Sequence, residues 1–165
     1  MSQAAQFNSR GAEAQPRVTA HVQVNGQWRP FSAILDSGND ITLIGQDTAS
    51  KLGITRRMAR SNFKVQFGQT ANQAHNFYMV QIPMRFNNMK PFMASVGVGP
   101  VRENLIGRKD AFEHHTIVFD KGQIRMFQSS PNQNSFGIDL GNNRQVYDMA
   151  KRGRGYQSVV PNNYV

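Results

Sequence analysis

Two apolar runs flank a short polar turn in the stretch Phe31-Ser32-Ala33-Ile34-Leu35-Asp36-Ser37-Gly38-Asn39-Asp40-Ile41-Thr42-Leu43-Ile44. The polar residues interrupt any 3.6-residue period, so the pattern predicts two buried strands joined by a tight turn rather than a helix. In this arrangement the carboxylate of Asp36 lies at the end of an apolar strand. Gly38 lets the backbone come close to whatever that carboxylate faces.

The residues before and after this stretch also carry clear local signals. Apolar residues alternate with polar ones over residues 18–24, which predicts a half-buried strand. Asn25-Gly26 is a strong signal for a two-residue hairpin turn, so we expect residues 27–35 to return as the partner strand. Residues 46–52 predict a short helix that ends at Gly53.

The chain continues with short strands and polar turns. Alternation predicts a hairpin from residues 63–67 and 77–84 around a polar segment at 68–73. One short helix is expected at 108–114, and a hairpin over residues 117–127 closes the domain. Many short strands with little helix predict an all-β, barrel-like domain.

Composition indicates one domain in a chain of 165 residues. We expect a disordered leader at 1–16, a folded domain at 17–128 and a flexible polar and basic tail at 129–165, because the two ends are polar and show no sustained period. There is no cysteine, no signal-peptide pattern and no apolar run long enough to span a bilayer. These features predict a cytoplasmic protein with no membrane contact.

The net charge of +9 is unevenly distributed. No acidic residue occurs between Asp47 and Glu103, whereas that interval contains Lys51, Arg56, Arg57, Arg60, Lys64, Arg85, Lys90 and Arg102. Such a field attracts RNA or an acidic partner, and a solvated basic surface is the plainer interpretation. The candidate contact segments are residues 51–64 and, in the tail, 151–156, although a solubilising tail explains the second one more simply.

Three pieces of the sequence resemble the retropepsin-like aspartic proteases of retroviruses and gypsy-type LTR retrotransposons. They are the Asp36-Ser37-Gly38 (DSG) stretch with its apolar flanks, the segment Ala49-Ser50-Lys51-Leu52-Gly53-Ile54, and Glu103-Asn104-Leu105-Ile106-Gly107-Arg108-Lys109-Asp110-Ala111-Phe112. Their order and separation match the family, and the resemblance covers roughly residues 17–128. It implies a closed, acid-protease-like β-barrel with one or two short helices, a single-lobe fold that dimerises. It also implies a retrotransposon-derived origin, in either an excised or a domesticated form.

Hydrolysis of a peptide without a metal or a nucleophile needs a water molecule activated between two carboxylates that share one proton. The chain has one Asp-Ser/Thr-Gly motif, because the nearest lookalike, Asp139-Leu140-Gly141, lacks the hydroxyl. One motif per chain completes a pair only when two chains meet about a two-fold axis. Since the resemblance also implies a dimer, we expect a homodimeric aspartic endopeptidase that acts on a polypeptide substrate without a cofactor, each chain providing its Asp36.

The resemblance also assigns roles to the residues around Asp36. The Ser37 hydroxyl is expected to brace the two active-site loops of the dimer, and Gly38 to offer backbone close to the acids. Asp40 and Arg108 are expected to pair beneath the site as a structural brace, together with Gly107. Contacts with the substrate are expected at Asn39, Asp40 and, in the flap hairpin, Gly68, Gln69 and Thr70.

Two departures from the family keep a second interpretation open. The family usually has Ala at the position of Asn39, and its flaps commonly contain more Gly than the single Gly68 here. The alternative is a catalytically weak or inactive retropepsin-fold module for dimerisation or peptide binding in an RNA-associated complex.

The four histidines give only a weak signal for a metal site. They are His21, His75, His114 and His115, and no Cys or acid stands at a suitable ligand spacing beside the adjacent pair. We therefore expect surface histidines and no bound metal.

Overall fold

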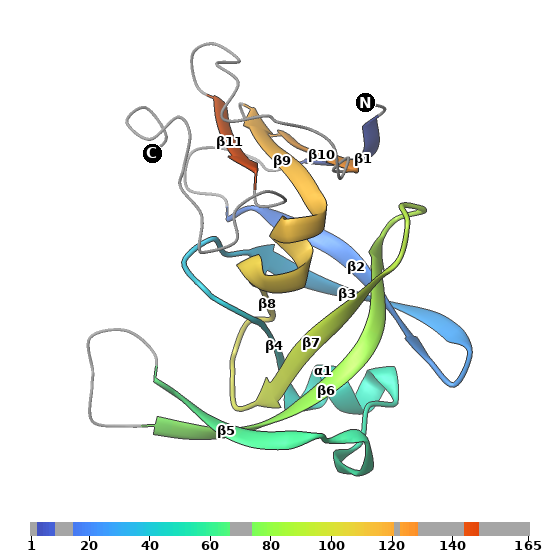
Figure 1. The fold of residues 1–165 in the computed structure, drawn as a ribbon, viewed down its shortest axis with the longest axis vertical. Helices are drawn as coiled ribbons and strands as arrows, with labels where there is room; N and C mark the ends of the chain where they lie inside the picture. Colours follow the sequence, from blue (N-terminus) through green and yellow to red (C-terminus); the bar gives the residue numbers. More distant parts are fainter. Residues whose placement is uncertain (1–2, 9–14, 67–73, 121–122, 129–143, 149–165) are drawn as a thin grey trace.

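A computed structural model describes residues 3–8, 15–66, 74–120, 123–128 and 144–148 (Figure 1). One α-helix and two short helical turns lie among eleven strands in this part of the chain. In chain order the elements are β1 (Gln3–Asn8), β2 (Arg17–Val24), β3 (Gln27–Leu35), β4 (Thr42–Gly45), α1 (Gln46–Leu52), η1 (Arg56–Met58), β5 (Ser61–Gln66), β6 (Ala74–Phe86), β7 (Phe92–Gly99), β8 (Leu105–Ile106), η2 (Arg108–Phe112), β9 (His115–Asp120), β10 (Gln123–Gln128) and β11 (Arg144–Asp148).

The larger sheet closes on itself. Its strands follow the order β2-β3-β8-β4-β7-β6-β5, and a further pairing between β2 and β6 makes a ring of the first six. Most neighbours are antiparallel, whereas β3 with β8 and β4 with β7 are parallel. The strand β5 extends the sheet outside the ring by pairing with β6. The prediction of an all-β, barrel-like fold with little helix is therefore confirmed.

The hydrophobic core fills the ring and continues under the second sheet. Alternating residues of β2 point inward, and Val18, Ala20, Val22 and Val24 are at most 3% exposed. The core cluster runs on to Ile117 of β9 and Ile124 of β10 without a break. The two sheets therefore belong to one folded unit, with the second sheet at the top of Figure 1.

Two turns have the geometry that their residues predict. Asn25 and Gly26 have φ angles of 52° and 77°, and they connect β2 to β3 in the register that pairs Val24 with Gln27. Gly53 has a φ of 81° just past α1, and its N–H donates to the Ser50 carbonyl at 3.1 Å. Both turns use the left-handed region that Asn and Gly tolerate.

The segment 108–114 is not the continuous helix that the sequence predicts. In η2, Lys109 has an extended conformation (φ −61°, ψ 135°) and Asp110 a positive φ of 70°. The Asp110 carboxylate accepts a hydrogen bond of 2.7 Å from the Ser95 N–H in β7. A short polar side chain that bonds the backbone of another element competes with regular helix geometry at its own position.

Two short strands differ from the expectation of unstructured ends. β1 pairs antiparallel with β10, and β11 pairs antiparallel with β9. Each adds to one side of the β9–β10 hairpin, giving the order β1-β10-β9-β11. Backbone hydrogen bonds to an existing strand require no apolar period, so periodicity does not reveal such strands.

The histidine His115 is buried, which corrects the expectation of four surface histidines. Its side chain is 0% exposed, packs edge-on against Phe86 and Phe92, and has Nδ1 2.6 Å from the Ala111 carbonyl oxygen. The Nδ1–H therefore donates and the ring behaves as an aromatic core residue. Burial lowers the pKa of His115 to about 4, because desolvation and nearby His114 outweigh the hydrogen bond to Ala111.

In the described part of the chain, none of the helices is long and apolar enough to cross a lipid bilayer.

The lowered pKa of His115 predicts a loss of stability in acid. The unfolded chain binds this proton near pH 6.5 and the folded chain only near pH 4, so the free energy of unfolding falls as the pH drops through that interval. A shift of this size corresponds to about 3 kcal/mol. Denaturant unfolding at a series of pH values, compared with His115→Gln, is expected to show a steeper acid loss in the parent. Gln81→Asn, a change at an exposed residue of β6 that does not titrate, is the control and should keep the parent's slope. Equal slopes for the parent and His115→Gln would contradict the prediction.

Candidate active site

The Asp36 loop connects β3 to β4, the two strands of the ring that lie on either side of β8. The N–H of Asp36 donates to the Ile106 carbonyl of β8 at 2.9 Å, so the position is set by an element seventy residues further along the chain. The N–H of Gly38 donates to Asp36 Oδ1 at 2.9 Å, and the N–H of Asn39 donates to the Asp36 carbonyl at 3.1 Å. The carboxylate is thus half-buried and oriented by its own loop.

The parallel pairing of β3 with β8 brings two distant segments together. Ile34 lies opposite Leu105 and Leu35 opposite Ile106, and the Ile34 N–H donates to the Asn104 carbonyl at 2.8 Å. Both strands end at the same level, so the Asp36 loop and the segment 107–109 leave the sheet side by side.

The segment after β8 holds the Asp36 loop by hydrogen bonds from its backbone and from the Arg108 side chain. The N–H of Arg108 donates to the Asn39 carbonyl at 2.9 Å, and the N–H of Lys109 donates to the Asp40 carbonyl at 2.8 Å. The guanidinium Nη1 of Arg108 donates to the Ser37 carbonyl at 2.7 Å, while Nη2 forms an ion pair with Asp40 Oδ1. Three residues of the loop, Ser37, Asn39 and Asp40, are therefore held by one short segment.

Asp40 and Arg108 lie together, as the resemblance implies, but their exposure limits the energy of the pair. The Asp40 side chain is 80% exposed and that of Arg108 20%. An ion pair with one solvated partner contributes little, about 0–1 kcal/mol. The bond from Arg108 to the Ser37 carbonyl is more sheltered, so the guanidinium braces the loop mainly through that carbonyl.

Gly107 fits a space that no side chain can enter. A Cβ at this position would lie 2.3 Å from both the carbonyl carbon and the carbonyl oxygen of Ile41. The N–H of Gly107 donates to the buried Thr42 hydroxyl at 3.2 Å. This close approach of two backbones is what allows the neighbouring Arg108 to reach the loop.

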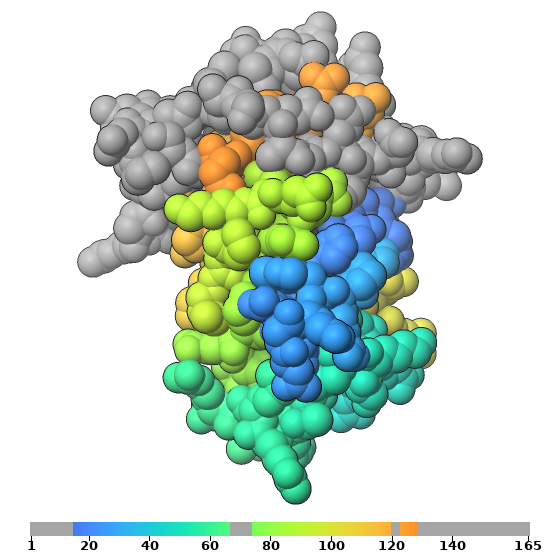
Figure 2. All heavy atoms as spheres, turned by 90° about the vertical axis from the view of Figure 1, so that its right-hand side faces the viewer, coloured from blue at the N-terminus to red at the C-terminus, as the bar shows by residue number. Residues whose placement is uncertain are grey.

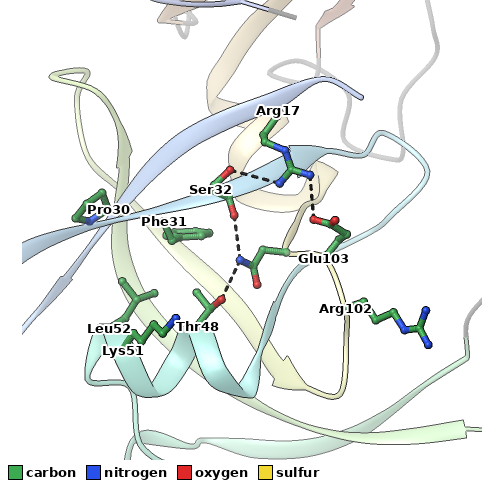
Figure 3. A pocket seen from close by; sticks show the side chains of 10 residues that line it. Arg17, Pro30, Phe31, Ser32, Thr48, Lys51, Leu52, Arg102 and Glu103 are labelled. Carbon is green, nitrogen blue, oxygen red and sulfur yellow. Dashed lines mark hydrogen bonds and ion pairs between the residues drawn. The ribbon is translucent and has the colours of Figure 1, made fainter. Parts of the chain in front are cut away.

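Asn104 is a positioning residue to which the sequence analysis gave no role. Its Oδ1 accepts from the Gly45 N–H at 2.9 Å, and its Nδ2 donates to the Ser32 carbonyl at 2.9 Å and to the Thr48 hydroxyl at 3.1 Å (Figure 3). One amide thereby ties together β3, β4 and α1. The only sequence signal is that an amide with both donors and acceptors directly precedes the apolar pair of β8.

The hollow beside Asn104 is separate from the Asp36 loop. Its volume is about 320 Å³, and its wall includes the exposed Arg17–Glu103 ion pair, in which Arg17 lies opposite Ile34 of β3 (Figure 3). No residue between Asp36 and Asp40 lines it. In the described part of the chain, no three His, Asp or Glu side chains come together as a metal-binding group.

The predicted substrate contacts fall into two sets. Asn39 is half-buried and Asp40 is exposed in the loop next to Asp36, so both lie beside the candidate site. Gly68, Gln69 and Thr70 lie outside the described residues, which include only the stems of the hairpin, β5 and β6.

The tight approach at Gly107 predicts a large effect of the smallest possible side chain. Gly107→Ala is expected to lower the free energy of unfolding by about 3 kcal/mol or more, because the obstructing atoms are backbone and cannot rotate away. Gly26→Asn is the matched control, since that position is open and Asn tolerates its positive φ. Denaturant titration at one protein concentration measures both, and equal stability of the two variants would contradict this account.

Because Asp40 is far more exposed than Arg108, we expect their substitution by Ala to lower the free energy of unfolding by different amounts. Arg108→Ala should cost about 2 kcal/mol of stability, because it leaves the Ser37 carbonyl without its donor. Asp40→Ala should cost less than about 1 kcal/mol, because that carboxylate is solvated. Thermal and denaturant unfolding of both variants measures the difference. Equal losses would indicate that the ion pair itself carries the energy.

Comparison with known proteins gives a family match. No curated protein matches the chain at a significant level. The model of the family described as "gag-polyprotein putative aspartyl protease" matches residues 20–110, more than half of the 165 residues. The matched region begins within β2 and includes the other strands of the ring. It also includes the Asp36 loop and the Gly107-Arg108 segment. The chain therefore belongs to the gag-polyprotein aspartyl protease family.

Proposed function

We propose that the protein is a homodimeric aspartic endopeptidase that cleaves peptide bonds in extended polypeptide segments. In this proposal a water molecule is activated between two Asp36 carboxylates, one from each chain. The observation that carries it is the single Asp-Ser-Gly motif of an aspartyl protease family member, held in a loop that is cross-linked to the segment after β8.

The local geometry supports a catalytic carboxylate. A general base must be held in a fixed orientation, and the hydrogen bond of 2.9 Å from the Gly38 N–H to Asp36 Oδ1 restrains this one. The loop around it makes backbone hydrogen bonds to Arg108 and Lys109, which are independent of any substrate. Such support is typical of a preorganised site.

The reaction follows from the pairing of like charges. Two carboxylates about 3 Å apart cannot both ionise readily, so the pair shares one proton. The ionised partner takes a proton from the water as it attacks, and the protonated partner donates to the scissile carbonyl oxygen. Activity should then depend on pH as a bell-shaped curve, whose two limbs belong to the pair and to neither residue alone.

The substitution of Asn39 for the family's usual Ala leaves the loop's backbone bonds available. The N–H of Asn39 donates to the Asp36 carbonyl and its carbonyl accepts from Arg108. Both bonds involve main-chain atoms, so they do not depend on the identity of the side chain. This supports retained catalysis over an inactive dimerisation or peptide-binding module.

Mixing two forms of the chain tests whether one site needs two copies of Asp36. Asp36→Asn alone should cleave no unstructured peptide. When the parent and Asp36→Asn are refolded together in equal amounts, random pairing should leave about one quarter of the parent's activity at the same total concentration. Activity is followed by mass spectrometry of peptide fragments, with a statine-type inhibitor as a check on the class of protease.

The control is Asp47→Asn, an exposed acid on α1, which should give full activity in the same mixture. Residual activity of one half with Asp36→Asn would indicate sites that work in single chains. Cleavage by Asp36→Asn alone, or an active species with the mass of a monomer, would contradict the proposal outright.

A further inference from the structure

Five basic side chains gather at the end of the molecule opposite the second sheet. They are Lys51, Arg56, Arg57, Arg60 and Lys64, and we call this set the basic end. The blue-green atoms of the segment from α1 to β5 form the lower end of Figure 2. All five side chains are exposed, and none forms an ion pair within the described part of the chain. The basic end therefore carries positive charge without local neutralisation.

Between Ser61 and Val65, the strand β5 offers a sheet edge at the same end that no described strand occupies. It pairs with β6 from Ser61 opposite Met79 to Gln66 opposite Ala74, and it is the last strand in the order of its sheet. Its other edge pairs with no described strand and lies along the lower margin of Figure 1. A row of unpaired backbone N–H and C=O groups is a template for an added strand.

A hollow lies on the surface of this hairpin. Its volume is about 300 Å³, and it is lined by Arg56, Asn62, Phe63, Lys64, Asn76 and Phe77. Asn62 and Lys64 alternate on one face of β5, and Lys64 lies opposite Asn76 of β6. Because side chains alternate along a strand, Lys64 and the two amides point to the face of the hairpin opposite to that of the Phe63–Phe77 pair. Two cations and two amides thus line the hollow, which suits a carboxylate with hydrogen-bonding groups around it.

The guanidinium of Arg56 is held in place before any partner arrives. Its carbon lies 5.3 Å from the centre of the Tyr78 ring, a cation–π contact. A side chain that is already restrained loses less conformational entropy when it binds. Arg56 is accordingly a better anchor for a carboxylate than a freely moving arginine.

The same contacts argue against two other occupants. Single-stranded nucleic acid uses exposed aromatic rings for stacking, but Tyr78 and Phe77 are only 8% and 2% exposed, and Phe63 is half-buried with its ring centre 5.7 Å from that of Phe77. A second copy of β5 would bring Lys64 and the basic end against their own like charges. An acidic polypeptide meets neither obstacle.

We propose that the free edge of β5 and the adjacent hollow form a docking site for an extended acidic segment of a polypeptide. The segment adds to the sheet as a strand, and acidic side chains at alternate positions lie over Asn62, Lys64 and Arg56. Because neighbouring strands place facing side chains about 5 Å apart, one register puts a carboxylate beside Lys64. The site does not include Asp36, so it is independent of the proposed protease activity.

The experiment uses the full chain carrying Asp36→Asn, which binds but does not cut, and dye-labelled twelve-residue peptides in fluorescence anisotropy. The binding probe alternates Glu with Thr. The comparison peptides are the alternating Lys-Thr version, a version with the same composition in which the Glu residues are contiguous, and two versions N-methylated on alternate residues in either phase. Single-stranded RNA of the same net charge is measured in parallel over a range of salt concentrations.

The alternating Glu peptide should bind more tightly than the other two sequences, and one phase of N-methylation should weaken it while the other has little effect. Lys64→Glu and Arg56→Gln should each weaken binding about three- to ten-fold. Lys90→Glu, on the exposed turn between β6 and β7, is the matched charge control and should change it by less than two-fold. Circular dichroism confirms that each variant is folded.

The proposal is overturned if Lys64→Glu has no larger effect than Lys90→Glu, or if neither phase of N-methylation weakens binding. Binding of RNA that exceeds peptide binding and falls steeply with salt would assign the basic end to a polyanion instead. Because the probe is measured on an inactive variant, failure of the protease proposal leaves this result unaffected.

Discussion

The close approach of residues 107–109 to the Asp36 loop is the contact on which the candidate site depends. Two short strands, β3 and β8, run parallel and end together, and the backbones that follow them pack with no room for a Cβ at Gly107. The hydrogen bonds from Arg108 and Lys109 to the loop follow from that proximity, because the two residues reach it only from this position. The geometry of the candidate site is therefore a consequence of strand pairing within the ring.

The energy of this contact comes mainly from hydrogen bonds to backbone carbonyls. The visible ion pair between Asp40 and Arg108 has one strongly solvated partner, whereas the loop's carbonyls at residues 37, 39 and 40 all receive donors from the neighbouring segment. Leaving a sheltered carbonyl unpaired costs more than losing an exposed charge pair. An arginine at position 108 is thus valuable for its several donors in a planar fork as much as for its charge.

Local signals in the sequence were sufficient where one or two residues determine the backbone. The turns predicted at Asn25-Gly26 and at Gly53 are correct, because few residue types tolerate the positive φ of those positions. The segment at η2 was predicted wrongly because Asp110 bonds to Ser95, fifteen residues earlier in another strand, and no local pattern encodes that partner. The burial of His115 likewise depends on Phe86, Phe92 and the Ala111 carbonyl, which meet only in the folded chain.

The residues of the candidate site likewise fall into those that short motifs indicate and those that only tertiary contacts reveal. The acid, its Ser-Gly neighbours and the Gly107-Arg108 pair were found through three short motifs, since a resemblance transfers residue by residue. Asn104 was quoted within one of those motifs without a role, because its three hydrogen bonds join elements that are far apart in sequence. Motifs indicate the candidate reacting groups, whereas the residues that support them are found from tertiary contacts.

Closure of the ring by the β2–β6 pairing has a consequence for misassembly. A closed sheet has no lateral edge at which further chains can stack, so growth of an amyloid-like ladder from the main sheet is limited to β5 among the described strands. There, every incoming copy would carry the same cationic lysine into register with its predecessor. The main sheet is in this way protected against fibre formation at β5, the described strand that continues it beyond the closed ring.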